Sequence, residues 1–263
     1  MYALVTGASS GIGLHYATQL ARDYHYDLLL VSNQEQQLLE VADSLSRAYG
    51  VRARSLYIDL SRMDAADQVY AFCRKEDLQV EVLVNNAGML IFDAFRNVPM
   101  QRIETLLMLH VVTATKLCRL FAPAMCERRK GFILNMSSMS AWMAMPSIVC
   151  YNASKSYLLN FSRALWYEMR PFGVHVLAVT PGSTDTGLLP FGEKFGRLLR
   201  GVGITMPPER LVHAALRHLF RSRRKRSMPG AWNRIIVPII NHLPDWLVFA
   251  VMRRMPMFQS QSK

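Results

Sequence analysis

The sequence contains little that points to a disulfide framework, a metal centre or secretion. Its four cysteines are scattered, and no two of them form a Cys-x-x-Cys pair or another metal-ligand spacing. The apolar run that predicts the first strand begins at Tyr2, so we expect no signal segment ahead of it. These features predict a cytoplasmic protein with reduced cysteines and no metal site.

Acidic residues are nearly missing from the last fifth of the chain. Residues 210–263 contain eleven Lys or Arg but a single acid, Asp245, and they account for ten of the twelve net positive charges. A basic segment can bind nucleic acid or an anionic membrane, or it can simply face solvent. Because no nucleic-acid-binding motif or aromatic and basic stacking pattern accompanies the charge, we expect no nucleic acid partner.

The C-terminal part also lacks an apolar run long enough to cross a bilayer, which takes about 20 residues. Residues 231–263 instead predict two short helices, one with an apolar stripe from Trp232 to Leu243 and one, WLVFAVM, that Asp245 caps. We expect this helical extension to pack on the rest of the domain, on a second subunit of a homo-oligomer or on a membrane surface. The membrane alternative would use residues 221–254 for peripheral contact, with their basic side chains drawn to anionic lipids.

Six apolar runs alternate with helical segments through the rest of the chain. Continuous runs such as DLLLV at 27–31 are typical of parallel strands that are buried on both faces. The alternation predicts an α/β protein with a Rossmann-like, doubly wound parallel sheet and helices on both faces. We assign this fold to residues 1–230 as one domain. The predicted strands are 2–5, 27–31, 52–58, 82–84, 132–136 and 174–179, and the predicted helices are 14–22, 34–49, 63–77, 99–128, 147–170 and 207–221.

The first strand is followed by a glycine-rich loop and a helix. Gly7, Gly11 and Gly13 allow a tight turn and a close approach to a ligand, and the helix start presents N–H groups to an anion such as a pyrophosphate. The second strand ends at Ser32 and Asn33, where a dinucleotide site would have an acid for the adenosine ribose or an Arg for a 2′-phosphate. Neither charge is present, and the absence of an acid favours NADP over NAD.

A second group of residues has the chemistry of proton transfer. Tyr151 and Lys155 stand four residues apart on one face of a predicted helix, and Ser138 follows the fifth strand. A nearby ammonium favours the phenolate and lowers the pKa of a tyrosine towards neutral pH. A hydroxyl and a phenol that face each other can hold the oxygen of a carbonyl or alcohol between them. Taken alone, the Tyr and Lys pair is also compatible with an ordinary exposed helical face.

Together these motifs resemble the short-chain dehydrogenase/reductase family. The resemblance implies an oxidoreductase that exchanges a hydride between a nicotinamide and a carbonyl or alcohol, the cofactor supplying the hydride chemistry. It gives Tyr151 the role of general acid/base, Lys155 that of binding the nicotinamide ribose, and Ser138 that of orienting the substrate oxygen. The matching stretches lie within residues 2–187 and are TGASSGIG at 6–13, NNAG at 85–88, Ser138, YNASK at 151–155 and PGSTDT at 181–186.

The resemblance also implies a set of cofactor contacts, for NADP or alternatively NAD. Besides Tyr151 and Lys155, they come from the loops that follow the strands. They are Gly7, Ser9, Ser10, Gly11, Ile12 and Gly13 around the pyrophosphate, Ser32 and Asn33 at the adenosine ribose, Asp59 and Leu60 at the adenine, Asn86, Ala87 and Gly88 at the adjacent ribose, and Pro181, Gly182, Thr184 and Thr186 at the nicotinamide end.

One residue departs from the family pattern. Many members have an asparagine in the long fourth helix that completes a proton relay, and His110 stands at the matching position. Three outcomes stay open: an enzyme whose relay works with the substituted residue, an enzyme in which His110 itself shuttles protons, and impaired catalysis. The last outcome leaves a rival function, that of a non-catalytic dinucleotide-binding scaffold.

The segment after Ser138 indicates the kind of substrate. Residues 139–145, MSAWMAM, are apolar, and methionine side chains adapt to irregular shapes. We expect them to line a pocket for a bulky apolar ketone or secondary alcohol, although ordinary core packing would explain the same pattern. Residues 187–205 contain apolar side chains among glycines and are predicted to form a lid over that pocket.

Overall fold

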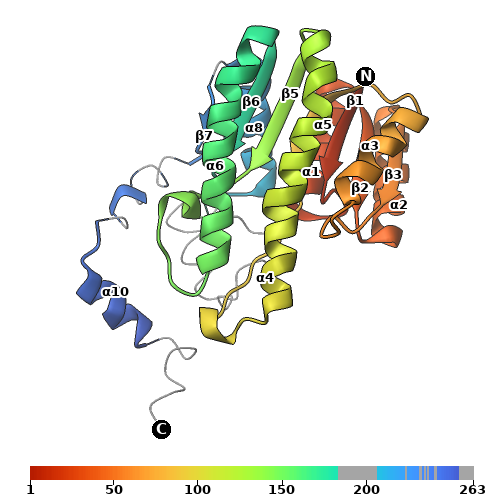
Figure 1. The fold of residues 1–263 in the computed structure, drawn as a ribbon. Helices are drawn as coiled ribbons and strands as arrows, with labels where there is room; N and C mark the ends of the chain where they lie inside the picture. Colours follow the sequence, from red (N-terminus) through yellow and green to blue (C-terminus); the bar gives the residue numbers. More distant parts are fainter. Residues whose placement is uncertain are drawn as a thin grey trace.

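A parallel sheet of seven strands forms the centre of the domain (Figure 1). The strands are β1 (Tyr2–Thr6), β2 (Asp27–Ser32), β3 (Ala53–Tyr57), β4 (Val80–Asn85), β5 (Gly131–Met136), β6 (Val174–Val179) and β7 (Arg226–Ser227). Their order is β3-β2-β1-β4-β5-β6-β7, and every neighbouring pair is parallel. The order reverses between β1 and β4, which creates a switch point where ligands bind at the carboxyl ends of the strands. The predicted doubly wound sheet is confirmed.

The computed structural model describes residues 1–182, 206–222, 224–230, 233, 235, 237–239 and 242–254. The predicted lid at 187–205 and two of the predicted cofactor residues, Thr184 and Thr186, lie outside the described residues. The division of the chain at residue 230 stays a prediction.

Helices cover both faces of the sheet. On one face lie α1 (Gly11–Tyr24), α2 (Glu35–Tyr49) and α8 (Pro208–Arg221). On the other lie α3 (Ala65–Lys75), α5 (Ala114–Glu127) and α6 (Val149–Met169). Each central strand therefore buries side chains on both faces, and this explains why its sequence is apolar throughout rather than alternating.

The helix that contains His110 is long and has an irregular middle. It runs over Met100–Glu127 and consists of α4 (Met100–Leu107), a π-helical turn at Met108–Thr113, and α5. Turns of the π type are rare and are frequently found at functional sites. Among the described residues this is the one helix whose length and apolar composition would allow it to cross a bilayer, but its inner face is packed into the domain core.

The sheet has one strand more than the six predicted from the sequence, and it lies at the end of the basic run at 221–226. Arg226 and Ser227 form the seventh strand, β7, which pairs with Ala178 and Val179 of β6. A strand of two residues has no periodic signal, and its pairing depends on a partner far back in the sequence. The end of the basic run is therefore built into the edge of the sheet.

The C-terminal segment is attached to the domain at its start and extends away from it at its end. Asn233 and Val237 are buried, whereas α10 (Asp245–Met252) lies apart from the sheet (Figure 1). Trp246 and Phe249 of α10 are 70% and 57% exposed. The predicted second helix is present, but Asp245 is its first residue, and Pro244 O before it accepts the N–H of Leu247 at 2.9 Å. The apolar stripe predicted before this helix is only partly described, because Trp232, Ile236 and Ile240 lie outside the described residues. Two of its described members, Ile235 and Ile239, are exposed.

A buried amide cluster connects the sheet to the helices behind the strand ends. Asn135 of β5 is fully buried; its Oδ1 accepts a hydrogen bond from Asn85 Nδ2 at 2.8 Å, and its Nδ2 donates to Ser162 Oγ at 2.8 Å. The three residues come from β4, β5 and α6. Because the cluster is buried, each of its hydrogen bonds matters more than it would in water.

We expect Asn135→Ala to lower the free energy of unfolding by about 2–4 kcal/mol, because it leaves a small cavity and removes a partner of both Asn85 and Ser162. Equilibrium denaturation in urea measures the loss. Asn160→Ala, an exposed change on α6, is the matched control and should alter this free energy by no more than about 0.5 kcal/mol. Equal losses in the two variants would contradict a stabilising role for the cluster.

Candidate active site

The loop between β1 and α1 has the shape of an anion site. Gly7 and Gly11 have positive φ angles of 65° and 54°, and a Cβ on Gly13 would lie 1.9 Å from the carbonyl oxygen of Gly7. At the start of α1, the side chain of Ser10 makes no capping hydrogen bond, and the first turn contains no acid. The N–H groups of this turn can therefore bind a phosphate.

Thr6 fixes the end of β4 beside this loop. Its hydroxyl accepts hydrogen bonds from the N–H groups of Asn86 and Ala87, at 2.9 and 3.0 Å, and donates to Val84 O at 3.2 Å. The Asn86 side chain donates to Thr6 O at 3.0 Å. Asn86, which was expected to contact the ribose, therefore uses its amide to hold the loop in place.

The two residues predicted at the end of β2, Ser32 and Asn33, have different environments. Ser32 is buried, and its hydroxyl hydrogen bonds with that of Ser9 at 2.9 Å. Asn33 is exposed. Of the two, Asn33 is the side chain that can meet a group on the adenosine ribose.

The end of β3 likewise places its two predicted residues differently. Asp59 is exposed, and its Oδ1 accepts hydrogen bonds from the N–H and the hydroxyl of Ser61 at 2.9 and 2.7 Å. Leu60 is buried, and its carbonyl accepts from Thr113 Oγ1 at 2.8 Å. Leu60 thus connects this loop to the π-helical turn.

Ser138, Tyr151 and Lys155 come together as the sequence predicts. Tyr151 and Lys155 lie in the first two turns of α6, and the hydroxyl of Ser138, just after β5, hydrogen bonds with the Tyr151 phenol. Lys155 Nζ donates to Met136 O at 2.9 Å and lies 5.5 Å from the centre of the Tyr151 ring. Lys155 is only 5% exposed.

Burial dominates the acid–base properties of this group. It lowers the pKa of Lys155 from 10.5 to about 7. It also raises the pKa of Tyr151, while the hydrogen bond with Ser138 acts in the opposite direction. The expected lowering of the Tyr151 pKa is therefore not found here, because the cost of burying a phenolate is the larger effect. A charged Lys155 would still stabilise that phenolate once it forms.

His110 connects the loop after β4 to the catalytic helix. Its Nε2 accepts a hydrogen bond from the N–H of Met89 at 3.0 Å, so the ring hydrogen lies on Nδ1 and is donated to Ser154 Oγ at 2.9 Å. Ser154 donates to Tyr151 O at 2.8 Å. Burial, and then the charge of Lys155, hold the pKa of His110 well below 6.5. The ring is therefore neutral, and both of its nitrogens are engaged.

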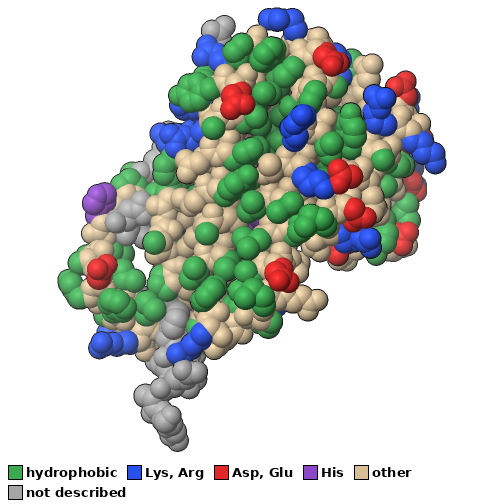
Figure 2. All heavy atoms as spheres, viewed as in Figure 1, with side chains coloured by type: hydrophobic (Ala, Val, Ile, Leu, Met, Phe, Trp, Pro, Cys, Tyr) green, Lys and Arg blue, Asp and Glu red, His purple; other side chains and the backbone are tan. Residues whose placement is uncertain are grey.

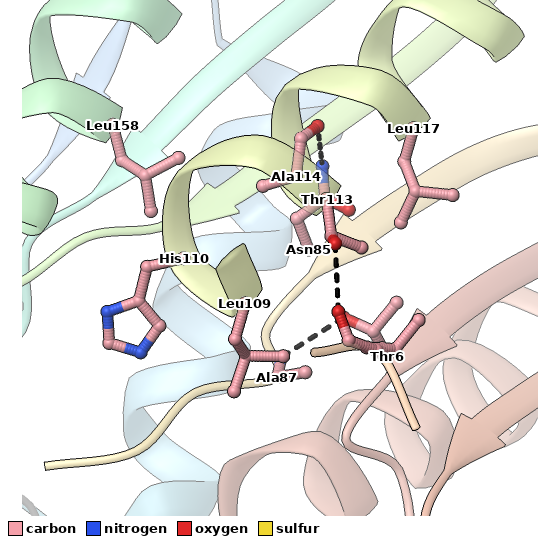
Figure 3. A pocket seen from close by; sticks show the side chains of 10 residues that line it. Thr6, Asn85, Ala87, Leu109, His110, Thr113, Ala114, Leu117 and Leu158 are labelled. Atoms are coloured by element: carbon pink, nitrogen blue, oxygen red, sulfur yellow. Dashed lines mark hydrogen bonds between the residues drawn. The ribbon is translucent and has the colours of Figure 1, made fainter. Parts of the chain in front are cut away.

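A cavity of about 10 Å³ lies next to His110, between the π-helical turn and the ends of β1 and β4 (Figure 3). Figure 3 shows His110, Thr113 and Leu117 on the helix, with Thr6 and Ala87 across from them. This volume accommodates about one water molecule. The cavity is therefore too small to be the substrate pocket.

The end of β6 brings two more predicted residues to the site. Pro181 O accepts a hydrogen bond from the N–H of Met139 at 2.8 Å, so it positions the loop after Ser138. A Cβ on Gly182 would lie 2.3 Å from the side chain of Asn233, so a larger residue there would displace Asn233. Asn233 is buried and comes from the C-terminal segment.

Sequence reasoning missed Thr6, Ser154 and Asn233. Thr6 and Ser154 lie within the quoted motifs TGASSGIG and YNASK, so their positions could have drawn attention to them. Asn233 has no local signal, because its partner Gly182 lies far from it in the sequence.

The sequence matches the family model for short chain dehydrogenases over residues 1–192. The very-long-chain 3-oxoacyl-CoA reductase of Bos taurus is 30% identical over 95% of this chain and 78% of its own length. The inactive hydroxysteroid dehydrogenase-like protein 1 of Rattus norvegicus is also 30% identical, over 94% of this chain and 73% of its own length.

Two solved structures resemble the whole chain. A bulky-bulky ketone specific alcohol dehydrogenase from Comamonas testosteroni has a TM-score of 0.76 and 28% identity, covering 100% of this chain and 96% of its own. A short-chain dehydrogenase from Sphingobium yanoikuyae in complex with NADPH has a TM-score of 0.77 and 30% identity, covering 100% of this chain and 98% of its own. The family match, the strand order and the Ser138, Tyr151 and Lys155 group agree, and the chain belongs to the short chain dehydrogenase family of oxidoreductases.

Proposed function

We propose that this oxidoreductase transfers a hydride between NADP and a bulky apolar ketone or secondary alcohol. The observation that supports it most is the meeting of Ser138, Tyr151 and Lys155 beside the glycine loop at the switch point of the sheet. Ser138, Tyr151 and Lys155 would supply the proton, and the glycine loop would bind the dinucleotide. These are the two requirements of this reaction.

The residues present fit a nicotinamide dinucleotide. Gly7, Gly11 and the first turn of α1 would hold the pyrophosphate, and Asn33 would face the adenosine ribose without repelling a 2′-phosphate. The bound nicotinamide would supply or accept the hydride. NADPH in the structure from Sphingobium yanoikuyae supports the choice of NADP.

The protein's own part in the reaction is to move one proton. In the direction of reduction, Tyr151 would donate its phenolic proton to the carbonyl oxygen, which Ser138 would hold by a hydrogen bond. Lys155, charged below its pKa of about 7, would stabilise the phenolate that is left. In the direction of oxidation the same phenolate would accept the alcohol proton.

The substrate class rests on the loop after Ser138 and on the names of two relatives. Met139 and Met145 of this loop are partly exposed or exposed, whereas Ser140 and Met143 are buried, so only part of the loop can line a pocket. The alcohol dehydrogenase from Comamonas testosteroni is specific for bulky ketones, and the bovine relative is a reductase of very-long-chain 3-oxoacyl-CoA. Both names support a large carbonyl substrate.

Assembly and location stay predictions. Hydrophobic side chains lie on the face that α5 and α6 form (Figure 2), and Tyr157 of α6 is 40% exposed, which supports the prediction of a homo-oligomer. The exposed Trp246 and Phe249 of α10, followed by Arg253 and Arg254, support peripheral contact with a membrane.

Replacement of Tyr151 by Phe tests the proposed function directly. We expect kcat/KM for reduction of apolar ketones by NADPH to fall about 10²–10⁴-fold, because the proton donor is lost, while the affinity for NADPH stays within about threefold. Tyr157→Phe, an exposed tyrosine on the same helix, is the matched control. A wild-type protein that binds NADPH but turns over no ketone of a broad panel would instead support the scaffold role; the relative from Rattus norvegicus is named as inactive.

The cofactor preference can be reversed at the end of β2. Asn33→Asp should weaken NADPH binding by about tenfold or more and leave NADH binding unchanged or tighter, since a carboxylate repels the 2′-phosphate and can bond the ribose hydroxyls. Fluorescence titration with each cofactor measures the change. Asn33→Ala removes the amide without adding charge and should have a much smaller effect. An equal loss for both cofactors would show that Asn33 does not face this ribose.

For His110, the geometry favours a positioning role over a proton shuttle, because the ring is neutral and both nitrogens are occupied. His110→Asn, His110→Ala and Ser154→Ala should each lower kcat by a similar factor of about tenfold, since each breaks the same link between Met89 and Tyr151. The pH profile of kcat should keep its shape. A changed profile, together with recovery of His110→Ala by added imidazole, would show that His110 shuttles protons.

A further inference from the structure

A large recess lies at the end of α6, and Trp142 of the loop after Ser138 also lines it. It encloses about 790 Å³ between the last turns of α6, the β7 strand and the C-terminal segment. Pockets of about 300–1,000 Å³ hold ligands of the size of a drug or a nucleotide. Three aromatic and four basic side chains dominate its walls: Trp142, Trp166, Tyr167, Arg170, Arg224, Lys225 and Arg226.

The aromatic rings hold three of these cations in place. Lys225 Nζ lies 4.3 Å from the centre of the Tyr167 ring and donates a hydrogen bond to the Tyr167 hydroxyl. The guanidinium carbon of Arg170 lies 4.8 Å from the centre of a Trp166 ring, and that of Arg226 lies 5.1 Å from the centre of a Trp142 ring. Cation–π contacts of this kind position a charge without neutralising it.

The recess is positively charged as far as the structure describes it. Within the part of the chain that the structure describes, none of the four forms an ion pair, and no Asp or Glu lines the recess. Some cations elsewhere in the chain do have such a partner, as Arg52 has Asp27 at 2.7 Å and Arg54 has Glu76 at 2.6 Å. Several like charges around one recess repel each other, and a bound anion relieves that repulsion.

We propose that this recess is a second binding site, for a ligand end that contains phosphate groups. Guanidinium groups bind phosphate through two parallel hydrogen bonds, and four cations match an end with more than one negative charge. The volume and the aromatic walls exceed what inorganic phosphate would need, so the ligand end also contains an organic part. A soluble phosphate ester and the headgroup of a phospholipid share this chemistry. The proposal does not depend on the proposed function.

Titration with adenosine 3′,5′-bisphosphate tests the site without any turnover. Trp142 and Trp166 line the recess, so their fluorescence should change on binding, and calorimetry gives the affinity. Lys225→Gln and Arg226→Gln should each weaken binding about tenfold, because each removes a charged hydrogen-bond donor. Lys75→Gln, an exposed lysine on α3, is the matched control and should bind like the wild type.

A second arm distinguishes the two sources of phosphate. Phosphatidylcholine vesicles with and without phosphatidic acid are sedimented with the full-length wild type and the same variants. Binding to phosphatidic acid that Lys225→Gln weakens, without binding of the bisphosphate, assigns the site to a lipid headgroup. Binding of the bisphosphate that Lys225→Gln weakens assigns it to a soluble ligand.

Two results would overturn the proposal. One is the absence of binding in both arms. The other is binding that Lys225→Gln and Arg226→Gln leave unchanged, which would place the bisphosphate in the glycine loop or the vesicles on α10. If thermal unfolding shows that Lys225→Gln or Arg226→Gln does not fold, Arg224→Gln takes its place, because the Arg224 side chain is exposed.

Discussion

The hydroxyl of Thr6 holds together the two strand ends on which the site depends. It accepts two N–H groups from the residues after β4 while it donates to β4 itself. Because β1 and β4 flank the switch point, this one side chain fixes the distance between the glycine loop and the loop that leads to His110. The buried cluster of Asn85, Asn135 and Ser162 continues the same arrangement towards α6. Polar groups buried in this way favour one arrangement of the strands, since any other would leave them unsatisfied.

Much of this site could be predicted from the sequence because its signals are local. The glycine loop, the pair Tyr151 and Lys155, and the apolar strands each depend on neighbours within a few residues, so pattern and spacing identify them. The roles within the site were harder to predict. The sequence places Asn86 and Ser32 at the cofactor; the structure shows their side chains bonded to Thr6 and Ser9, and their contact with the cofactor stays a prediction. Which way a side chain points depends on contacts that are distant in sequence.

Contacts between distant parts of the sequence also decide the roles of His110 and of the basic run at 221–226. The role of His110 depends on Met89 and Ser154, which belong to two other segments of the chain. The basic run at 221–226 has the composition of a solvated or membrane-binding segment, but its end pairs with β6 and its side chains meet aromatic rings of α6. In both cases the sequence identifies the residues but not the distant residues that they contact. Tertiary contact, rather than local preference, decided the outcome.

Two groups of positive charge lie at different depths of the structure. Lys155 is buried, and its lowered pKa shows the cost of burying its charge. Such a cation is useful where a negative charge forms only for a moment, as we propose for Tyr151. The recess at the end of α6 has its cations near the surface, where we propose that they bind a ligand that is already anionic. Lys155 belongs to α6, and so do Trp166 and Tyr167, the rings that contact Arg170 and Lys225 of the recess. One helix therefore contributes side chains both to the candidate active site and to the proposed second site.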